Sequence, residues 1–326
     1  MSLPLTLACA PYDRTFALAL GTVRPAGIDL TYWPMPVEEV FWRMTRHHEF
    51  DAAEMSMSSY LVRRARGDDA VIAIPVFTSR FFRHSCVFVN AHAGLRDAAD
   101  LKGKRVGVPE YQITANVWIR GFLADDYGVQ PSDIQWIQGG LEQTGRIEKL
   151  DISIPGVSIT PIGADQTLSQ MLAAGEIDAA IGARTPSTFD GVNVVRLFPD
   201  FKRVEQEYFT RTGIFPIMHA VVVRKTMLDR APWVARSLLD AFTAARDLWL
   251  AEMSQTSALA VMLPWMVAEL EETRRVLGDD YWPYGVEPNR RALEALTRYR
   301  FAQGLAERQL SVDELFAPST LDHYRI

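Results

Sequence analysis

One short stretch gathers basic side chains just before an apolar run. In SRFFRHSCVFVN, residues 79–90, the side chains of Arg80, Arg83 and His84 precede a strand-like segment that ends in a turn residue. Arginine can hold a carboxylate with two parallel hydrogen bonds, and imidazole titrates near neutral pH, with an ordinary pKa of about 6.5. Three such groups within five residues predict either a solvated strand end or a pocket for an anion.

The composition indicates an ordinary globular protein. The chain has 326 residues, which exceeds a typical single core, so we expect two lobes. It is 48% hydrophobic and 23% charged, which is typical of folded domains. The net charge of −6 indicates neither a nucleic-acid nor a membrane partner. Any anion site must therefore be local.

The cysteines and the apolar runs bear on the compartment. Cys9 and Cys86 belong to no Cys-x-x-Cys motif, so we expect buried thiols in a reducing cytosol. The apolar run 3–10 is short and follows no Lys or Arg, so we interpret it as a first strand rather than a signal peptide. The run 258–268 is interrupted by Pro264 and is too short to span a bilayer. We expect a cytoplasmic protein, with its oligomeric state, homo-oligomer included, left open.

Strand-like and helix-like segments alternate, which predicts an α/β fold with mostly parallel sheets. Two apolar runs, Ser85–Asn90 and Met218–Arg224, flank a complete α/β segment. We expect both to cross between lobes as hinge strands. Residues 90–218 then form an inserted lobe 2, and residues 1–89 with 219–326 form lobe 1. The predicted ligand site is a cleft between the lobes, beyond the carboxyl ends of strands and near helix N-termini.

Eight longer segments carry a family resemblance. They are APYDRT (10–15), FDAAEMSMSSY (50–60), FRHSCVFVN (82–90), GKRVGVPEYQITANVWIRGFL (103–123), WIQGGLEQTGRIEK (136–149), TLSQMLAAGEIDAAIGARTP (167–186), TGIFPIMHAVVVRK (212–225) and DYWPYGVEPNRRALEAL (280–296). Together, in order and over essentially the whole chain, they resemble the 4,5-dihydroxyphthalate decarboxylases. GRIEK and YWPYGVEPN point to the decarboxylase branch, whereas LKGKRVGV and LAAGEIDAAI occur widely among solute receptors of this fold. The resemblance implies a type II periplasmic-binding-protein-like fold used for enzymatic chemistry.

The resemblance also implies a reaction. A carboxy-lyase of phthalate degradation would convert 4,5-dihydroxyphthalate to protocatechuate and CO2 in the interlobe cleft. Each ring hydroxyl is para to one carboxylate and supplies electron density to the carbon that must be protonated, so no cofactor is required. The protein must provide a general acid, cations for the retained carboxylate and acceptors for the hydroxyl groups. The alternative is a non-catalytic solute-binding protein or sensor for an aromatic carboxylate.

The expected catalytic residues are two histidines and one carboxylate. We favour His84 as the proton donor, with Arg83 beside it as a carboxylate ligand. Because alternate residues of a strand face opposite ways, both reach one pocket only if the strand begins after them. His219, at the head of the second hinge strand, is the nearest rival, and Glu110 is a second-choice acid. A histidine that caps a buried strand end is the structural alternative for His84.

The expected substrate-binding residues lie at strand and helix ends. Arg14 follows the first predicted strand and is a candidate carboxylate ligand, with Asp13 as its orienter; a turn salt bridge is the alternative. Glu54 is a candidate acceptor for a catechol hydroxyl. Ser56 and Ser58 could cap a helix and present its N–H groups to an anion.

Three further binding residues are expected in the inserted lobe. Tyr111 and Thr114 lie at the start of a predicted helix, and Arg184 follows a predicted short strand. The chain contains no His-x-x-Glu or His-x-His spacing in support of a metal site, so we expect no bound metal. The sequence also lacks the P-loop, dinucleotide and Gly-x-Ser-x-Gly fingerprints.

Overall fold

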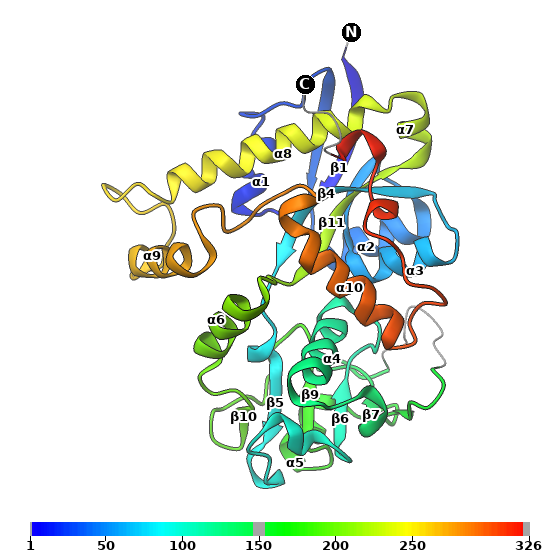
Figure 1. The fold of residues 1–326 in the computed structure, drawn as a ribbon, viewed down its shortest axis with the longest axis vertical. Helices are drawn as coiled ribbons and strands as arrows, with labels where there is room; N and C mark the ends of the chain where they lie inside the picture. Colours follow the sequence, from blue (N-terminus) through cyan, green and yellow to red (C-terminus); the bar gives the residue numbers. More distant parts are fainter. Residues whose placement is uncertain (1, 146–153, 322–326) are drawn as a thin grey trace. The chain divides into compact units, whose positions relative to one another are not determined.

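The computed structural model describes residues 2–145 and 154–321. The chain divides into two compact units, which can be followed by colour in Figure 1. Unit 1 comprises Met1–Arg80, Thr212–Glu294 and Leu310–Ile326, and unit 2 comprises Phe81–Arg211 and Ala295–Gln309. Apart from Gly145, the segment GRIEK lies outside the described residues.

Unit 1 is built on a five-stranded sheet with the order β2-β1-β3-β11-β4. Its strands are β1 (Leu3–Cys9), β2 (Ile28–Pro34), β3 (Ala52–Ser56), β4 (Val71–Arg80) and β11 (Ile217–Arg224). Strand β1 is parallel to β2 and β3, whereas β11 is antiparallel to both β3 and β4. The carboxyl ends of β1, β3 and β4 and the start of β11 therefore share one edge of the sheet.

Unit 1 also contains helices, several of which pack against its sheet. They are α1 (Asp13–Ala19), α2 (Val37–His47), α3 (Met57–Ala65), α7 (Lys225–Arg230), α8 (Trp233–Glu252), α9 (Met266–Leu277) and the start of α10 (Arg290–Ala302), with short 3-10 turns at Glu287–Asn289, Asp313–Leu315 and Pro318–Thr320. Helix α8 packs against α1 and β4, as Figure 1 shows, through a buried face that includes Val234, Leu238 and Phe242 at helical spacing. No helix in the described part of the chain is long and apolar enough to cross a membrane.

Unit 2 has a six-stranded mixed sheet with the order β10-β5-β9-β6-β7-β8. Its strands are β5 (Val87–Asn90), β6 (Arg105–Val108), β7 (Gln135–Gln138), β8 (Ile159–Pro161), β9 (Ala179–Ile181) and β10 (Val194–Arg196). Strand β6 is parallel to β7 and β9, and β7 is parallel to β8. Strand β5 runs antiparallel to β9 and β10. Both sheets are thus mixed, since each contains an antiparallel strand.

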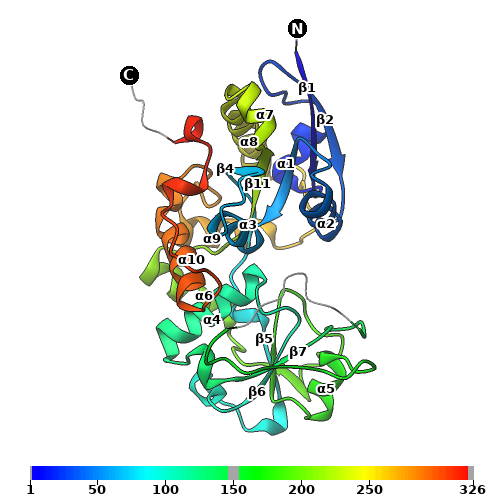
Figure 2. The ribbon, with the colours of Figure 1, turned by 90° about the vertical axis from the view of Figure 1, so that its right-hand side faces the viewer.

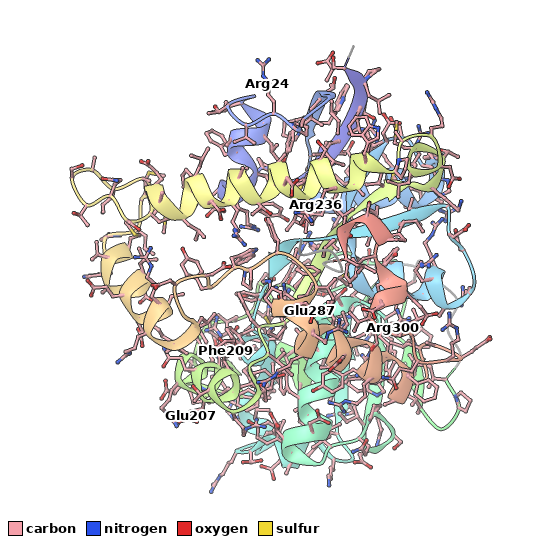
Figure 3. All side chains as sticks on the ribbon, turned by 45° about the horizontal axis from the view of Figure 1, so that its top comes forward. Arg24, Glu207, Phe209, Arg236, Glu287 and Arg300 are labelled. Atoms are coloured by element: carbon pink, nitrogen blue, oxygen red, sulfur yellow. The ribbon has the colours of Figure 1, made fainter. Side chains whose placement is uncertain are left out.

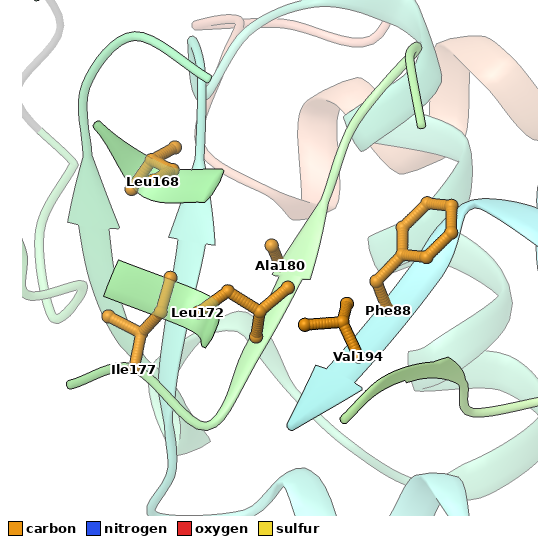
Figure 4. Packing of buried hydrophobic residues seen from close by; sticks show 6 residues of the cluster. All are labelled: Phe88, Leu168, Leu172, Ile177, Ala180 and Val194. Carbon is orange, nitrogen blue, oxygen red and sulfur yellow. The ribbon is translucent and has the colours of Figure 1, made fainter. Parts of the chain in front are cut away.

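Helices lie on both sides of this second sheet. They are α4 (Thr114–Tyr127), α5 (Leu168–Ala174) and α6 (Phe201–Thr212), with 3-10 turns at His84–Cys86, Ala91–Ala93, Ala98–Leu101 and Pro131–Asp133. In Figure 2, α4 and α5 lie on opposite sides of the sheet. A core cluster joins α5 to the sheet, and Figure 4 shows its members Phe88, Leu168, Leu172, Ile177, Ala180 and Val194.

The two expected hinge strands each belong to a single sheet. Strand β5 pairs only with strands of unit 2, and β11 pairs only with strands of unit 1, among the described residues. The strand pair nearest the points where the chain passes between units is β4 with β11, in which Arg80 lies opposite Ile217. The crossing therefore falls before β5 rather than within it.

The second half of α10 belongs to unit 2, whereas the sequence predicted it in lobe 1. Tyr299 packs edge-on against Trp118 of α4, with ring centroids 5.6 Å apart. Its ring also covers Gly121, where an added Cβ would lie 2.3 Å from a Tyr299 carbon. Gln303 accepts a hydrogen bond from buried Arg120 at 2.9 Å. These buried contacts with α4 explain why residues 295–309 fall in unit 2.

Candidate functional site

Glu54 is the centre of a hydrogen-bond network in unit 1. Its side chain, on β3, is completely buried. Oxygen Oε1 lies 2.7 Å from Nδ1 of His219 and accepts hydrogen bonds from the hydroxyl groups of Tyr12 at 2.8 Å and Thr78 at 2.9 Å. Three separate segments of unit 1 therefore meet at one carboxylate oxygen.

The second oxygen of Glu54 is also occupied. Oε2 accepts a hydrogen bond from the backbone N–H of Ala10 at 3.1 Å and from the thiol of Cys9 at 3.4 Å. Burial and the nearby Glu54 charge raise the pKa of the Cys9 thiol, which therefore stays protonated and can donate. Because a carboxylate has about four acceptor positions, these protein groups fill the hydrogen-bond acceptor positions of Glu54.

Glu54 is ionised in the folded protein. Burial alone would raise the pKa of its carboxyl group, but the hydrogen bond and charge of His219, with the hydrogen bonds from Ala10 and Tyr12, lower that pKa to about 2. A buried carboxylate held in this state can stabilise a positive charge on its histidine partner. The pair is therefore suited to holding and moving a proton.

The register of two antiparallel strands explains why Glu54 meets His219. Ser56 lies opposite His219 and Glu54 lies opposite Val221. Glu54 and His219 are thus diagonal neighbours, whose side chains share one face of the sheet. The His219 ring also packs edge-on against Phe41, with centroids 4.9 Å apart. Nδ1 faces Glu54, and the side chain keeps 18% of its surface exposed, so Nε2 is the nitrogen left for chemistry.

Arg14 is fixed beside this network. Its Nε and one terminal nitrogen donate to the carbonyl oxygen of Thr78, and its other terminal nitrogen lies 3.0 Å from Asp13 Oδ1. Its guanidinium carbon lies 4.0 Å from the ring centre of Tyr12 and 4.4 Å from that of Trp282. These contacts use three of the five N–H groups of an arginine, which leaves one on each terminal nitrogen within the described part of the chain. That remaining pair suits a carboxylate.

Asp13 and the two predicted serines also belong to unit 1. Ser56 is the N-cap of α3, as expected, and its hydroxyl accepts a hydrogen bond from the N–H of Ser59 at 3.5 Å. Ser58 is completely buried in the first turn of α3. Asp13, with 43% of its side chain exposed, orients Arg14 from the first turn of α1. The structure thus places six predicted residues in unit 1, namely Asp13, Arg14, Glu54, Ser56, Ser58 and His219.

His84 has a different environment, in unit 2. Its ring is 2% exposed and stacks on Phe122 at 4.0 Å, with an interplanar angle of 17°. Phe198 and Tyr208 contact it edge-on, at 5.4 and 5.3 Å. Phe209, labelled in Figure 3, lies on the same helix as Tyr208 and packs against Phe82. These contacts are typical of a histidine in an aromatic core.

One carboxylate faces His84. Glu205 Oε1 lies 4.0 Å from His84 Nδ1 and accepts from the Ser85 N–H at 3.2 Å. Burial, and then the charge of Arg211, lower the pKa of His84 to about 4. Burial raises the pKa of Glu205 to about 7, against the hydrogen bonds from the backbone of Ser85 and His84. His84 is therefore neutral at neutral pH, which does not favour it as a proton donor.

This buried neutral histidine has a measurable consequence for stability. Between pH 6.5 and about 4 the unfolded chain binds a proton at His84 that the folded chain does not. The associated stability is complete above pH 6.5 and falls by about 3 kcal/mol as the pH drops to 4. As the pH falls from 6.5 to 4, we expect the free energy of unfolding of His84→Phe to increase by that amount relative to that of the parent chain. Urea unfolding at several pH values measures the difference. A pH-independent difference would contradict the assignment.

Glu205 supplies the opposite control. Its folded pKa of about 7 lies above the ordinary 4.5, so its stability contribution is present below pH 4.5 and is lost as the pH rises through 7. We therefore expect the free energy of unfolding of Glu205→Gln to increase relative to that of the parent chain as the pH rises from 4.5 to 7. The two variants should show slopes of opposite sign.

The remaining predicted residues also lie in unit 2. Arg83 precedes the 3-10 turn His84–Cys86, and strand β5 starts at Val87. The strand therefore begins after both Arg83 and His84. Its guanidinium contacts the carbonyl of Ala183 at 3.4 Å. The roles expected for the unit 2 residues stay predictions. Their placements are as follows: Arg83, Glu110, Tyr111 and Thr114 are buried near β5 or the start of α4, and Arg184 is exposed after β9.

Tyr111 illustrates how deeply this region is packed. Its ring lies under the guanidinium of Arg120, 3.6 Å from ring centre to guanidinium carbon, and edge-on to Trp136. Burial raises the pKa of its phenol, so Tyr111 is a neutral group at neutral pH. It packs in the interior of unit 2.

Sequence reasoning missed several residues of the unit 1 network. Tyr12 contacts both Glu54 and Arg14, Thr78 bonds to both, and Trp282 covers the guanidinium. An aromatic residue two positions before Arg14, at the end of the first strand, was the available signal. In residues 2–145 and 154–321, no group of three or more His, Cys, Asp or Glu side chains is arranged to hold a metal ion.

Two solved structures with the same fold are described as sulfonate-binding proteins. The periplasmic aliphatic sulphonate binding protein SsuA of Escherichia coli is 12% identical, with a TM-score of 0.55 over 98% of this chain and 99% of that one. A sulfonate-binding SsuA protein of Methylobacillus flagellatus gives 14% identity and a TM-score of 0.53, over 98% and 92%. At such identities the likeness shows the fold, which is that of the periplasmic-binding-protein class.

Sequence relatives define the family. Residues 16–152 match the NMT1/THI5 like family. The 4,5-dihydroxyphthalate decarboxylase of Comamonas testosteroni is 44% identical over 327 residues, which cover 99% of each chain. That of Pseudomonas putida is 47% identical over 188 residues, covering 57% of this chain and 73% of the relative. The chain belongs to the 4,5-dihydroxyphthalate decarboxylase family, as its sequence motifs indicated.

Proposed function

We propose that the chain is a carboxy-lyase that converts 4,5-dihydroxyphthalate to protocatechuate and CO2. Relatedness over 99% of the chain to a 4,5-dihydroxyphthalate decarboxylase supports the substrate. The observation that carries the chemistry is the buried Glu54–His219 pair, which Tyr12 and Thr78 link to the Arg14 guanidinium. A proton-holding group and an anion-binding group therefore lie in one network.

The reaction consumes one proton, and one carboxylate of the substrate leaves as CO2. A para hydroxyl pushes electron density onto the ring carbon that carries the carboxylate, and the acid protonates that carbon. The carbon–carboxylate bond then breaks, its electron pair returns to the ring, and CO2 departs. The net change is replacement of CO2 by a proton, so the substrate itself supplies the electrons.

We assign the proton donation to His219. A protonated imidazole can deliver a proton from Nε2 while Nδ1 stays on the ionised Glu54. Partial exposure of His219 allows solvent to restore the proton after each turnover. The sequence favoured His84, but its enclosure among aromatic rings and its pKa of about 4 favour a structural role there. Because Glu54 is filled by protein donors, we place it behind His219 rather than against a catechol hydroxyl.

Turnover tests this proposal directly. Purified protein is incubated with 4,5-dihydroxyphthalate, and CO2 and protocatechuate are followed in time, with and without added divalent cations. We expect stoichiometric formation of both products. Binding of the substrate without either product, under all these conditions, would show a solute-binding protein instead.

Arg14 is expected to hold a substrate carboxylate. Arg14→Ala removes the pair of N–H groups that remains on its terminal nitrogens, and losing a charged hydrogen-bond pair costs about 1.5–3 kcal/mol. We therefore expect KM to rise by one to two orders of magnitude, measured by steady-state kinetics. Arg14→Lys should recover only part of the loss, because an ammonium group cannot present two parallel N–H groups.

A matched control is available in the same unit. Arg24 is exposed, its side chain extends from the surface in Figure 3, and its Nε donates to the carbonyl of Gly21. Arg24→Ala should leave KM unchanged. Equal KM values for Arg14→Ala and the parent enzyme would remove Arg14 from the binding site.

A further inference from the structure

The segment Tyr281–Asn289, which contains YWPYGVEPN, is fastened to strand β4. The N–H of Gly285 donates to the carbonyl of Pro75 at 2.8 Å. The indole N–H of Trp282 donates to the carbonyl of Phe77 at 2.9 Å. Gly285 has φ of +91°, a conformation that other residues rarely adopt, so the turn depends on glycine here.

Asn289 locks this segment from inside. Its side chain is 2% exposed, and its amide N–H groups donate to the carbonyls of Pro283 at 3.0 Å and Gly285 at 2.8 Å. Its oxygen accepts a hydrogen bond from the guanidinium of Arg80, which also donates to Pro283 at 3.2 Å. One buried amide therefore closes the segment on itself and ties it to the end of β4.

The buried Arg80 is used for this fastening. It is 6% exposed, and within the described part of the chain it makes no ion pair. Its hydrogen-bond acceptors, the Pro283 carbonyl and the Asn289 side-chain oxygen, are neutral, and it lies over the rings of Phe77 and Phe215 at 5.3 and 5.4 Å. A buried cation without a carboxylate is costly, and the hydrogen bonds to Asn289 and Pro283 offset part of that cost.

The fastening fixes one ring in particular. Trp282 packs edge-on against Phe215, with centroids 5.4 Å apart and an angle of 89°, and its carbonyl accepts from Arg246 at 3.0 Å. Its indole N–H is held by Phe77, so the ring has a defined orientation. The ring centre of Trp282 lies 4.4 Å from the guanidinium carbon of Arg14. Trp282 is therefore a support for Arg14 that comes from a segment 268 positions later in the chain.

We infer that Trp282 is a positioning residue for substrate binding, held in place by Arg80 and Asn289. Resting on the proposed function, this inference assigns to the segment Tyr281–Asn289 the task of keeping the Arg14 guanidinium in one orientation. With the ring in place, the two remaining N–H groups of Arg14 form a fixed fork for a carboxylate. Without it, the guanidinium keeps its hydrogen bonds to Thr78 and Asp13 but loses the indole contact, so the fork is less well pre-organised.

A double-mutant cycle tests the inference. Trp282→Leu, Arg14→Ala and the double variant are compared by KM and kcat for 4,5-dihydroxyphthalate and by urea unfolding. From the range of cation–π interactions we expect Trp282→Leu to raise KM by about two- to thirtyfold, with little change in kcat. In the Arg14→Ala background the same change should have no further effect, because the tryptophan then has no guanidinium to orient. Trp282→Phe should restore most of the loss.

Two control comparisons make the cycle decisive. Trp265→Leu makes the same change at a side chain that is 74% exposed, and it should leave KM unaltered. Asn289→Ala should raise KM as Trp282→Leu does, and the two should not add. Trp282→Leu effects that persist undiminished in the Arg14→Ala background, or an unaltered KM in folded Trp282→Leu, would overturn the inference. An unaltered KM in Arg14→Ala would instead overturn the proposed role of Arg14.

Discussion

Replacement of His219 by alanine is expected to lower kcat by about 10²–10⁴-fold, the range for loss of a general acid, with a smaller change in KM. The physical reason is the geometry at Glu54, whose ionised carboxylate lies 2.7 Å from Nδ1 of His219, fixes the ring and leaves Nε2 for the substrate. Steady-state kinetics of the purified variant, with circular dichroism to check folding, provides the measurement.

Two other histidines make this result interpretable. His92 is exposed, and His92→Ala should keep the parent kcat. His84→Gln tests the assignment that the sequence favoured. A folded but inactive His84→Gln enzyme together with an active His219→Ala enzyme would return the proton donor to unit 2. Turnover in both variants would leave Glu110 or a water molecule as the acid.

Replacement of Glu54 by glutamine should be almost as damaging. The amide keeps the shape of the carboxylate, but one end of it carries N–H groups and must face donors: either His219, Tyr12 and Thr78, or Ala10 and Cys9. The negative charge beside His219 Nδ1 is also lost. We expect kcat to fall by about 10²–10⁴-fold, as when the acidic partner of a catalytic histidine is removed.

The same variant should change the response of stability to acid. The folded pKa of Glu54, about 2, lies below its ordinary 4.5, so its contribution is present above pH 4.5 and is lost as the pH falls towards 2. The shift corresponds to about 3 kcal/mol. Glu54→Gln should lack this decline, measured by urea unfolding between pH 5 and 2. Glu39→Gln, at a half-exposed carboxylate, should retain it. An unchanged acid dependence in Glu54→Gln would contradict the ionised buried state.

Much of the fold could be predicted because its signals are local. Alternating strand and helix patterns predicted an α/β protein, which the structure has. The sheets to which the two expected hinge strands belong were harder to predict, because strand pairing depends on partners far away in sequence. The C-terminal half of α10 looks like any amphipathic helix. Its packing on Trp118 and Gly121 depends on a segment about 180 residues earlier.

The candidate site shows the same limit. Residue types nominated Glu54, His219 and Arg14 separately, but their association comes from the register of β3 against β11. Nothing in the sequence reveals that register, since a one-residue slip would turn every side chain to the other face. The preference for His84 rested on the near-neutral ordinary pKa of histidine and on the family resemblance. The aromatic rings of Phe122, Phe198 and Tyr208 that enclose it come from distant segments.

The division of α10 between the units has a consequence for biosynthesis. Unit 2 takes most of its residues from Phe81–Arg211, yet it also includes Ala295–Gln309. A ribosome makes the chain from the N-terminus, so unit 2 lacks Tyr299 and Gln303 until more than 80 further residues have been added after Arg211. During that interval Trp118, Gly121 and Arg120 have no partner from α10 to cover them. Unit 2 can therefore complete this part of its interior only after α10 has been synthesised.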